Sequence, residues 1–322
     1  MKLGVIMDPI SGINVKKDST FAMLLAAQRR GWAIHYMELN DLFVRDGTPM
    51  GRMRTLSVDD RPDAWFRFHD DQISPLSALD VILMRKDPPV DTEYIYSTHL
   101  LELAMRQGAL VVNHPVSLRD VNEKLFITHF PQCIPPTLVT RSAAQIRDFV
   151  DEHGDIVLKP LHGMGGMFIF RLNRKDPNVA VITESLTEFE SRYVMAQKFI
   201  PEIEKGDKRI LLIDGEPIGY ALARIPRAGD FRGNLAAGGR GVGVELSDRD
   251  RWICAQLAPV LKGKGLLFVG LDVIGDRLTE INVTSPTCVR ELDALYGLNL
   301  SARLFEVLET RLSARSRAAA AS

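Results

Sequence analysis

One short segment of this 322-residue chain limits what it can fold into, because the segment places acidic and amide side chains on apolar strands. Residues 269–291 contain two runs typical of β-strands, separated by a Gly-Asp turn, and the runs carry Asp272, Glu280 and Asn282. An unpaired charge inside an apolar sheet is costly, so such carboxylates need a partner. Oxygen ligands of this kind suit Mg²⁺. The segment predicts a metal-binding hairpin or, alternatively, a hairpin with a solvated polar face.

The register of this hairpin decides whether the three oxygen ligands can share a metal site. Glu280 and Asn282 are two residues apart, so on a strand they point to the same side. A regular two-residue turn at 275–276 would pair Asp272 with Thr279 and direct Asp272 away from Glu280, because directly opposed residues share a face. Shared ligation needs Asp272 opposite Glu280. We therefore predict a three-residue turn or a β-bulge, with one residue there in the left-handed region.

The first part of the chain, residues 1–121, alternates apolar strands with amphipathic helices. Strands are expected at 3–7, 80–85 and 109–113, and helices at 19–30 and 94–107. Such alternation is typical of a doubly wound parallel sheet, and the fold class is therefore α/β. The polar stretch 46–72 has no clear pattern and is expected to form a loop or an edge hairpin.

Two further regions, 122–198 and 199–312, precede a tail at 313–322 that is expected to be disordered. In the second region we expect a helix at 143–153 and strands at 155–161, 168–172 and 193–199. In the third region we expect a hairpin of strands 209–213 and 218–225, a helix at 247–263 and a C-terminal helix at 301–312. Ser247 and Asp250 are spaced for a capping box at the start of the helix at 247–263.

A lysine and a glycine-rich turn indicate a phosphate-binding site in the second region. Lys159 ends an apolar strand and is followed by Gly163-Met164-Gly165-Gly166. A point charge beside a loop of free backbone N–H groups can hold phosphate, although a plain tight turn would show the same glycines. Lys124 is a second isolated lysine. The chain has neither the phosphate-loop motif G-x-x-x-x-G-K-[ST] nor the dinucleotide fingerprint G-x-G-x-x-G after its first strand.

Arginines gather in the third region, two of them on the arms of the expected hairpin and the others in a loop. Arg209 and Arg224 could each bind a carboxylate or a phosphate in two-point geometry, or could pair with surface acids. The loop 226–244 is rich in glycine and carries Arg227, Arg232 and Arg240. A loop of this length in a compact chain is usually functional or disordered. Its composition suits a lid that closes over an anion, and a flexible linker is the alternative.

Composition narrows the class of function. The net charge is −1, apolar residues make up 46% and charged residues 25% of the chain, and no apolar stretch approaches the length of a membrane span. We therefore expect no nucleic-acid or membrane partner. The three cysteines are too few and too scattered for a disulfide framework or a zinc site, which fits a reducing cytoplasm. Of these, Cys288 follows Thr287 near the expected substrate site, where it is expected to be either open to thiol reagents or buried and inert.

Several motifs together resemble a known family. The segments 270–274 and 280–286, with Lys-Pro-Leu-His-Gly-Met-Gly-Gly at 159–166, look like an ATP-grasp ligase. More specific pieces resemble the bacterial glutathione synthetases: Met-Asp-Pro-Ile at 7–10, Leu-Met-Arg-Lys-Asp-Pro-Pro at 83–89, Ser-Leu-Arg-Asp-Val-Asn-Glu-Lys at 117–124, the run 232–241 and Val-Thr-Ser-Pro-Thr-Cys at 283–288. The resemblance extends to about Leu312. One departure is His162, which stands where an aspartate is common.

The resemblance implies a pre-ATP-grasp domain at 1–121, followed by an ATP-grasp fold of two subdomains, at 122–198 and 199–312. It also implies an activity, the ATP-dependent joining of γ-glutamylcysteine to glycine through an acyl phosphate, with release of ADP and phosphate. The implied cofactor is a pair of Mg²⁺ ions, with Mn²⁺ as a possible substitute, and the implied assembly is a homotetramer. The partners are then the small molecules ATP, γ-glutamylcysteine and glycine.

The same resemblance assigns roles to individual residues. The implied nucleotide-binding residues are Lys124, Lys159, Gly163, Gly165, Gly166, Gln197, Lys198, Phe199, Ile200, Asp207 and Lys208. The implied catalytic residues are Arg209, Arg224, Arg232 and Asn234; the acyl substrate would meet Arg85, Ser285 and Thr287; and the metal ligands would be Asp272, Glu280 and Asn282. Two alternatives stay open, namely another ATP-grasp ligase that joins a different acid and amine, and a nucleotide-binding regulator without activity.

Overall fold

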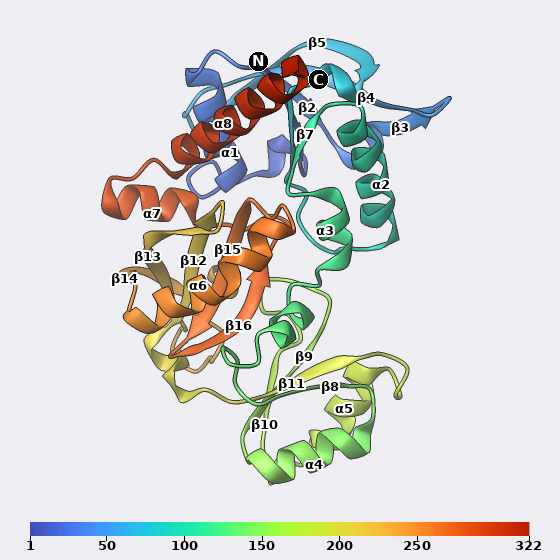
Figure 1. Ribbon diagram of the computed structural model, residues 1–322. Coiled ribbons are helices and arrows are strands. Elements are labelled where there is room, and N and C mark those ends of the chain that lie inside the picture. The colour runs from blue at the N-terminus through green and yellow to red at the C-terminus, as the bar shows by residue number, and fades with distance from the viewer. Residues whose placement is uncertain (322) are drawn as a thin grey trace.

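The computed structural model of the protein describes residues 1–321, which form three β-sheets with helices packed on them (Figure 1). The sheets follow one another along the chain: a seven-stranded sheet, a four-stranded sheet and a five-stranded sheet. The five-stranded sheet lies between the other two in Figure 1. None of the helices in these described residues is long and apolar enough to cross a membrane.

Four parallel strands form the centre of the first sheet, in the order β2-β1-β6-β7. They are β1 (Lys2–Ile6), β2 (Ala33–Met37), β6 (Val81–Met84) and β7 (Leu110–Val112). Leu3 and Val5 of β1 face helix α1 (Ser19–Arg29), whereas Ile6 faces helix α2 (Thr92–Arg106). Because successive strand residues point to opposite faces, one helix covers each face. The predicted doubly wound parallel sheet is confirmed.

An antiparallel extension continues the first sheet where the sequence suggested a loop or an edge hairpin. Strand β4 (Thr48–Val58) pairs with β2, with the short β3 (Leu42–Arg45) and with β5 (Phe66–Pro75), so the edge-hairpin alternative is the correct one. Most of β5 is exposed. A strand that faces water on both sides carries no strict apolar alternation, which explains the weak pattern.

The second sheet is small, antiparallel and covered on one face by two helices. Its order is β10-β9-β11-β8. The strands are β8 (Thr137–Thr140), β9 (Ile156–Pro160), β10 (Phe170–Leu172) and β11 (Val194–Lys198), and the helices are α4 (Ala143–His153) and α5 (Val179–Thr187). Ser142 caps α4 by accepting from the backbone N–H of Gln145, and Gly154 ends it with φ 75°. This unit has its own core, in which Ile146 and Phe149 of α4 pack on Ile156 and Leu158.

The third sheet carries most of the predicted site residues. Its antiparallel order is β14-β13-β12-β15-β16. The strands are β12 (Asp207–Ile213), β13 (Glu216–Ile225), β14 (Arg240–Glu245), β15 (Phe268–Ile274) and β16 (Arg277–Asn282). Helix α6 (Asp248–Gly263) covers one face and begins with the predicted capping box, in which Ser247 and Asp250 each accept from the other's backbone N–H. The loop predicted as a lid joins β13 to β14.

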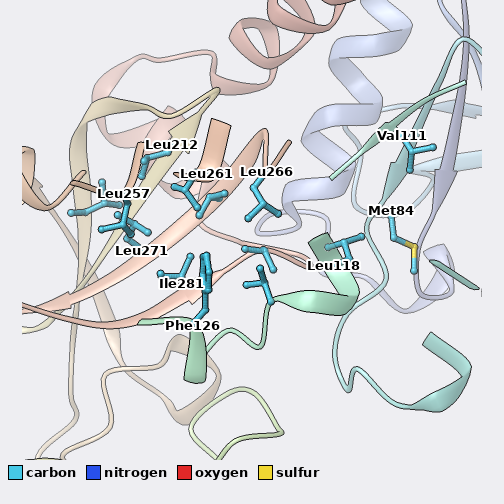
Figure 2. Close-up of a cluster of buried hydrophobic side chains, with 14 of the residues drawn as sticks. Met84, Val111, Leu118, Phe126, Leu212, Leu257, Leu261, Leu266, Leu271 and Ile281 are labelled. Carbon is cyan, nitrogen blue, oxygen red and sulfur yellow. The ribbon is translucent and has the colours of Figure 1, made fainter. Parts of the chain in front are cut away.

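The first and third sheets share an apolar core, whereas most buried residues of the second sheet pack in the separate core already described. Figure 2 follows the shared cluster from Met84 and Val111 of the first sheet, past Leu118 of α3 (Pro115–Asp120), to Leu261 and Ile281 of the third region. A core that crosses between two sheets fixes their relative position, because close-packed interiors resist deformation. The second sheet joins this cluster through Met195 of β11.

The end of the chain returns to its beginning. Helix α7 (Val289–Tyr296) is followed by α8 (Leu300–Ala321), which lies along α1 in Figure 1. The Trp32 and Phe305 rings meet edge to face with centroids 5.0 Å apart, and Arg30 Nη2 donates to the Ala302 carbonyl over 3.0 Å. The expectation of a disordered tail from residue 313 is wrong for 313–321, which continue α8; Ser322 lies outside the described residues.

Candidate active site

The hairpin of β15 and β16 has the bulge that the sequence required. Ile274 lies opposite Arg277 across a two-residue turn whose Gly275 has φ 55°. Val273 then pairs with Leu278, and Asp272 with Glu280, so Thr279 is the extra residue of a β-bulge. The bulge restores the register, and both carboxylates extend from the same face of the sheet. The prediction made for this turn is confirmed.

Asp272 is buried between two arginines. Its carboxylate accepts from Arg209 Nε over 2.5 Å and Nη2 over 3.1 Å, and Arg224 Nη2 lies 2.8 Å from Oδ2. The side chain of Asp272 is 3% exposed. Burial acts to raise the pKa of Asp272, but the two guanidinium groups outweigh burial and hold the pKa below its usual range. Asp272 is therefore a charged carboxylate at the base of the site.

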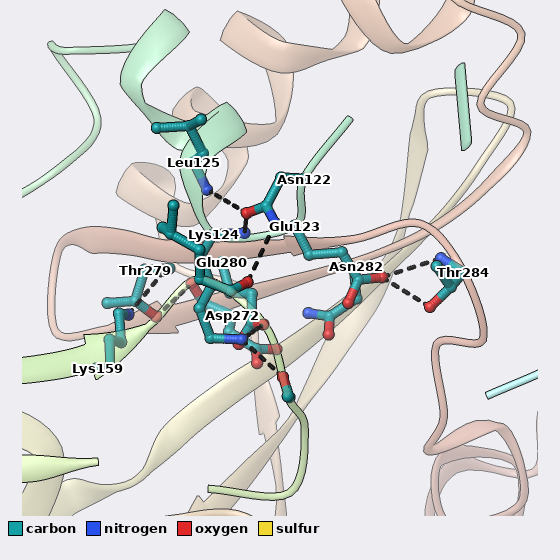
Figure 3. Close-up of polar contacts among 12 residues, drawn as sticks. Asn122, Glu123, Lys124, Leu125, Lys159, Asp272, Thr279, Glu280, Asn282 and Thr284 are labelled. Atoms are coloured by element: carbon teal, nitrogen blue, oxygen red, sulfur yellow. Dashed lines mark hydrogen bonds and ion pairs between the residues drawn. The ribbon is translucent and has the colours of Figure 1, made fainter. Parts of the chain in front are cut away.

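Glu280 and Asn282 offer oxygens above this base (Figure 3). Lys124 Nζ lies 3.0 Å from Glu280 Oε1, and Asn282 Nδ2 donates to the Gly270 carbonyl over 3.2 Å. The bond through Nδ2 leaves the amide oxygen of Asn282 as the group free to coordinate. Two carboxylates and one amide oxygen on one face form a hard donor set that fits Mg²⁺. In residues 1–321 no group of three or more His, Cys, Asp and Glu side chains could hold a metal ion, and the set described here combines two carboxylates with one amide.

The two predicted phosphate-binding lysines meet at this hairpin. Lys159 is 6% exposed and its Nζ donates to the Thr279 carbonyl over 3.4 Å. Burial lowers the pKa of Lys159 to about 8. Lys124 Nζ donates to the Gly163 carbonyl over 2.9 Å, which connects it to the glycine-rich turn. Both ammonium groups are thus directed at the face that carries Glu280.

The glycine-rich turn needs glycine for its backbone. Gly163, Gly165 and Gly166 have φ of 98°, 67° and 81°. At these angles a side chain would strain the backbone. A Cβ on Gly166 would also lie 2.7 Å from the Asn234 side-chain oxygen. The backbone of the turn therefore lies in direct contact with Asn234 of the loop between β13 and β14.

The loop predicted at 226–244 is shorter than expected, because residues 240–244 pair with β13 as part of β14. We call the remaining residues 226–239 the lid, after the role predicted for them; they contact this turn through Arg232 and Asn234. Arg232 Nη1 donates to the Gly166 carbonyl over 3.3 Å. The rest of the Arg232 guanidinium binds the Asp230 carboxylate, with Nη2 to Oδ2 at 2.8 Å. Gly233 lies so close to β13 that a Cβ there would be 2.5 Å from the Arg224 carbonyl oxygen. The structure therefore places the lid directly over Arg224.

These elements enclose a cavity of about 270 Å³. Most of the predicted residues line it: Lys124, Lys159, Gly163, Gly165, Gly166, Gln197, Lys198, Phe199, Ile200, Asp207, Arg209, Arg224, Arg232, Asn234, Glu280, Asn282, Ser285 and Thr287. Sequence reasoning missed the apolar wall of Val157, Ile169, Ile203 and Ile274. The alternation of β9 was the available signal, because Val157 and Lys159 must share a face.

Asp207 lies in the same cavity beside Arg224. Its Oδ2 accepts from Arg224 Nη2, while its Oδ1 is buried without a hydrogen-bond partner. Burial raises the pKa of Asp207 to about 6, and Asp272 acts in the same direction. A buried oxygen without a donor is uncommon in folded proteins, which makes Asp207 a candidate for contact with a ligand.

A second cavity, of about 410 Å³, opens beside the first. It lies at the carboxyl ends of β1 and β6, where ligands commonly bind in doubly wound sheets. Arg85, 5% exposed, donates from Nε to the Thr20 hydroxyl and from Nη2 to the Pro286 carbonyl, each over 3.0 Å. Asp87, Ser285 and Thr287 line both cavities. The two cavities therefore share a wall.

The structure corrects the expectation for Lys208 and decides between the two alternatives given for Cys288. Lys208 does not line the first cavity: it lies on the face of β12 opposite to Asp207 and Arg209, and its ammonium binds Asp250 of α6. Alternation along a strand permits only one of two neighbouring residues to face a site. Cys288 is 1% exposed, and burial raises the pKa of its thiol, so the buried alternative is the correct one. His162 is exposed and lines neither cavity.

Glu123 is the main residue that the sequence reasoning missed. It lines the first cavity, and its Oε1 accepts from the backbone N–H groups of Val283 and Thr284 over 2.7 and 3.0 Å and from the Thr284 hydroxyl over 2.9 Å. Burial raises the pKa of Glu123, and Glu280 contributes in the same direction. Its neighbour Lys124 drew attention as a phosphate ligand, and the available signal for Glu123 was its place in the motif at 117–124 that carries the family resemblance.

Comparisons with known proteins agree with this geometry. The family model of the prokaryotic glutathione synthetase N-terminal domain matches residues 1–119, and that of the prokaryotic glutathione synthetase ATP-grasp domain matches residues 123–297. A glutathione synthetase of Yersinia pestis is 60% identical over 314 residues, which cover 97% of this chain and 98% of the relative. One of Pseudomonas aeruginosa is 58% identical over 315 residues, covering 98% and 99%.

Solved structures of lower identity share the fold. The D-cycloserine synthetase DcsG superposes with a TM-score of 0.69 at 14% identity, covering 97% of this chain and all of the other. The ATP-grasp ligase PsnB, complexed with minimal precursor, Mg and ADP, gives 0.61 at 18% identity, covering 97% and 98%. Two matched domain models that together span most of the chain, and relatives of such identity over almost its full length, lead to one conclusion: the chain belongs to the prokaryotic glutathione synthetase family of ATP-grasp ligases.

Proposed function

We propose that this enzyme joins γ-glutamylcysteine to glycine, using ATP to activate the dipeptide's carboxylate as an acyl phosphate. The observation that carries the proposal is the shared wall of the two cavities at Asp87, Ser285 and Thr287. A nucleotide in the first cavity and an acid in the second would then meet at that wall. Placing both reactants side by side is the main requirement of phosphoryl transfer.

The first cavity suits ATP. Its apolar wall and the strand-end residues Gln197 to Ile200 offer an edge for adenine, and the unsatisfied Asp207 Oδ1 offers an acceptor for a ribose hydroxyl. Lys159 and Lys124, together with the N–H groups of 163–166, would neutralise the phosphates. Lys208 has no part in this arrangement, since its charge is held by Asp250.

Asp272, Glu280 and Asn282 would hold the metal ions, and we propose two of Mg²⁺, with Mn²⁺ as a substitute. Bound there, the ions would neutralise developing charge on the phosphates. Asp272 would have to exchange part of its contact with Arg209 or Arg224 for the metal, because both of its oxygens are engaged by these arginines.

The second cavity suits a dipeptide with an ammonium group and two carboxylates. Arg85 is a buried cation with a fork that matches a carboxylate, and Asp8, Asp18 and Asp87 supply negative charge for an ammonium. Ser285 and Thr287 would orient the reacting carboxylate at the shared wall. We assign these residues to the acyl substrate.

The reaction then proceeds in two displacements. An oxygen of the dipeptide carboxylate takes the γ-phosphoryl group of ATP and releases ADP. The glycine nitrogen attacks the carbonyl carbon of the acyl phosphate, loses a proton and expels phosphate, which forms the amide. Arg209 and Arg224, which line the first cavity, would stabilise the oxygens that gain charge. Arg232 and Asn234 of the lid would cover the acyl phosphate and keep water from hydrolysing it.

The test measures ADP release with a series of carboxylic acids, each combined with a series of amines. ADP release should require γ-glutamylcysteine and glycine together, and hydroxylamine in place of glycine should trap the acyl phosphate as a hydroxamate. Equal or faster turnover with a different acid–amine pair would reject this substrate in favour of another ATP-grasp ligation.

We also propose the cellular and assembly context. Three free cysteines, all buried, are compatible with a reducing cytoplasm. We propose a homotetramer in which the regions 1–121, 122–198 and 199–312 act as domains. Light scattering on the purified chain would test the tetramer, and limited proteolysis would test the domain boundaries.

A further inference from the structure

The loop 283–288, which we name the substrate loop, connects the metal strand β16 to α7 and lines both cavities. Its conformation is not a relaxed one. Cys288, at its end, has φ 83°, in the left-handed region that non-glycine residues rarely adopt because it is strained. A loop held in such a conformation needs anchors on the surrounding structure.

One anchor is a single carboxylate oxygen. Glu123 Oε1 accepts from two successive backbone N–H groups of the loop, those of Val283 and Thr284, and from the Thr284 hydroxyl. Hydrogen bonds to a charged acceptor are stronger than neutral ones, and a buried donor left unpaired is costly. Glu123 therefore determines where the loop leaves β16.

The same residue is continuous with the nucleotide site. The Glu123 carbonyl accepts from the N–H of Ile281 over 2.9 Å, between the two predicted metal ligands of β16. The next residue, Lys124, pairs with Glu280 and with the glycine-rich turn. Asn122 holds this segment from the other side by accepting from the N–H groups of Lys124 and Leu125.

The far side of the substrate loop is held independently. Arg85 donates to the Pro286 carbonyl, and Asn113 Nδ2 donates to the Val283 carbonyl over 2.6 Å. Arg85 belongs to the second cavity and Glu123 to the first. The substrate loop is therefore anchored by one residue of each cavity, Glu123 in the first and Arg85 in the second. A displacement of the loop at one anchor would change its position at the other.

We propose that Glu123 is a positioning residue that anchors the substrate loop to the nucleotide site and so couples ATP binding to binding of the acyl substrate. This inference rests on the proposed function for the identity of that substrate. Glu123 acts through the loop: Ser285 and Thr287, which would touch the dipeptide, are placed by the bonds that Glu123 makes to Val283 and Thr284.

Three variants of the full chain test this role. Glu123→Ala removes the acceptor, Glu123→Gln keeps an oxygen in its place, and Thr284→Val removes one of the three donors. Glu152→Gln, at a 72% exposed side chain of α4, is the matched control. For each variant we would measure KM for γ-glutamylcysteine, kcat, and the affinity for a non-hydrolysable ATP analogue with and without the dipeptide. Hydrogen exchange of peptides covering 283–288 would report on the loop directly.

With Glu123→Ala we expect KM for the dipeptide to rise about tenfold or more, because charge-assisted bonds are lost. Affinity for the ATP analogue without dipeptide should stay within about threefold, so that the effect of one ligand on the other disappears. Exchange in 283–288 should accelerate while that in α4 does not. Glu123→Gln should recover most of the loss, and Thr284→Val should raise KM about threefold to fivefold.

Three results would overturn the proposal: a dipeptide KM within about twofold of wild type in Glu123→Ala, a parallel fall of both affinities with the thermal midpoint, or a Glu123→Gln variant that binds both ligands but has no turnover. If Glu123→Ala does not fold, Glu123→Gln and Thr284→Val decide by the same measures. Failure of the wild type to turn over γ-glutamylcysteine would reject the proposed function alone, because loop exchange and analogue binding still test Glu123.

Discussion

Two pairs of strands in this molecule carry arginine–aspartate pairs of the same chemistry in opposite surroundings. On the edge pair β4–β5, Arg52 binds Asp71 with side chains 57% and 40% exposed. On β12 and β15, Arg209 binds Asp272 with side chains 7% and 3% exposed, and Arg224 adds a second cation. Water screens the first pair, so little depends on it. The second pair is shielded from water, so each of its charged side chains depends on its partners to offset the cost of desolvation.

The comparison shows that burial, rather than the pairing itself, determines how strongly the stability and the chemistry of the protein depend on an ion pair. A buried carboxylate between two arginines is a poor way to stabilise a fold, because desolvation offsets much of the attraction. Asp272 does not itself line the first cavity, but Arg209 and Arg224, which it holds, do, and we infer that the buried group is retained for chemistry. Variants in the two strand pairs can test this contrast.

The largest expected effect is on turnover at the metal strand. Glu280→Gln keeps the shape of the side chain and removes one charge from the metal-binding face. We expect kcat to fall by about 1,000-fold, of the order seen when an electrostatic contact to a transition state is lost, far beyond any loss of stability that follows from the weakened contact with Lys124. Steady-state kinetics at saturating Mg²⁺ and a thermal scan check this. Glu216→Gln on β13, whose side chain is 61% exposed, is the control, and near-normal turnover of Glu280→Gln would refute the assignment.

The next effect is on stability at the buried pair. Asp272→Asn leaves Arg209 without its counter-ion and leaves Arg224 with Asp207 alone, and removing one member of a buried network costs about 3–5 kcal/mol. Urea unfolding should show this loss, whereas Asp71→Asn should leave the unfolding midpoint where it is. Equal urea midpoints for Asp272→Asn and Asp71→Asn would show that the buried and the exposed pair do not differ in their effect on stability.

A smaller effect concerns pH and nucleotide binding. Because burial lowers the pKa of Lys159 to about 8, the ammonium that faces the phosphates loses its proton at a lower pH than an exposed lysine does. Affinity for an ATP analogue should therefore fall as pH rises above 8, by up to about tenfold per unit, and Lys159→Arg should move the fall to higher pH. Calorimetric titrations between pH 7 and about 9.5 measure it. Affinity that is flat across this range would show that the Lys159 charge is unimportant.

The lowered pKa of Lys159 also makes the stability of the folded chain depend on pH in a definite direction. The unfolded chain binds the Lys159 proton up to a pKa of about 10.4, whereas the folded chain releases it near 8. Between these values the unfolded state binds more protons, so this group makes folding more favourable as pH rises and less favourable as pH falls through the window. Urea midpoints of wild type and Lys159→Met across that window should differ in slope in this sense.

The smallest effect is on the lid. Trypsin should cut first after an arginine of 227–240, and ATP with γ-glutamylcysteine should slow the cut several-fold, because ligands favour the ordered state. In the lid, Arg227 is exposed, with a side-chain exposure of 64%, whereas Arg232 is bound to Asp230. Cutting at Arg52 on the edge pair should be unaffected by ligands. Equal rates with and without ligands would contradict a substrate-gated lid.

Local sequence could predict what depends on short-range rules. The alternation of residues 1–121 predicted the parallel sheet, Ser247 and Asp250 predicted the start of α6, and the spacing of Asp272 and Glu280 predicted the bulge. Each follows from the period of a strand or the geometry of a helix end. The cavity-lining residues came largely from the family resemblance, since no local rule brings Lys159 to Thr279.

What could not be predicted depends on contacts across long stretches of chain. Glu123 meets Thr284 across 161 residues, and nothing in either neighbourhood announces the pairing. Lys208 was assigned to the nucleotide although strand alternation already opposed it to Asp207 and Arg209. The continuation of α8 through 313–321 escaped notice because an Ala- and Arg-rich segment fits a frayed tail as well as a helix.

The return of α8 to α1 has a consequence for how the chain is made. Protein synthesis delivers the N-terminal region first, and domains commonly fold as they emerge from the ribosome. Here Leu24 and Trp32 belong to an apolar cluster completed by Leu304, Phe305 and Leu308 of α8, which are translated long after α1. Until then the side of α1 and Trp32 that α8 covers stays open to water. A nascent chain therefore keeps this apolar surface uncovered until α8 has been made, and termination before residue 300 would leave a product that chaperones and proteases recognise.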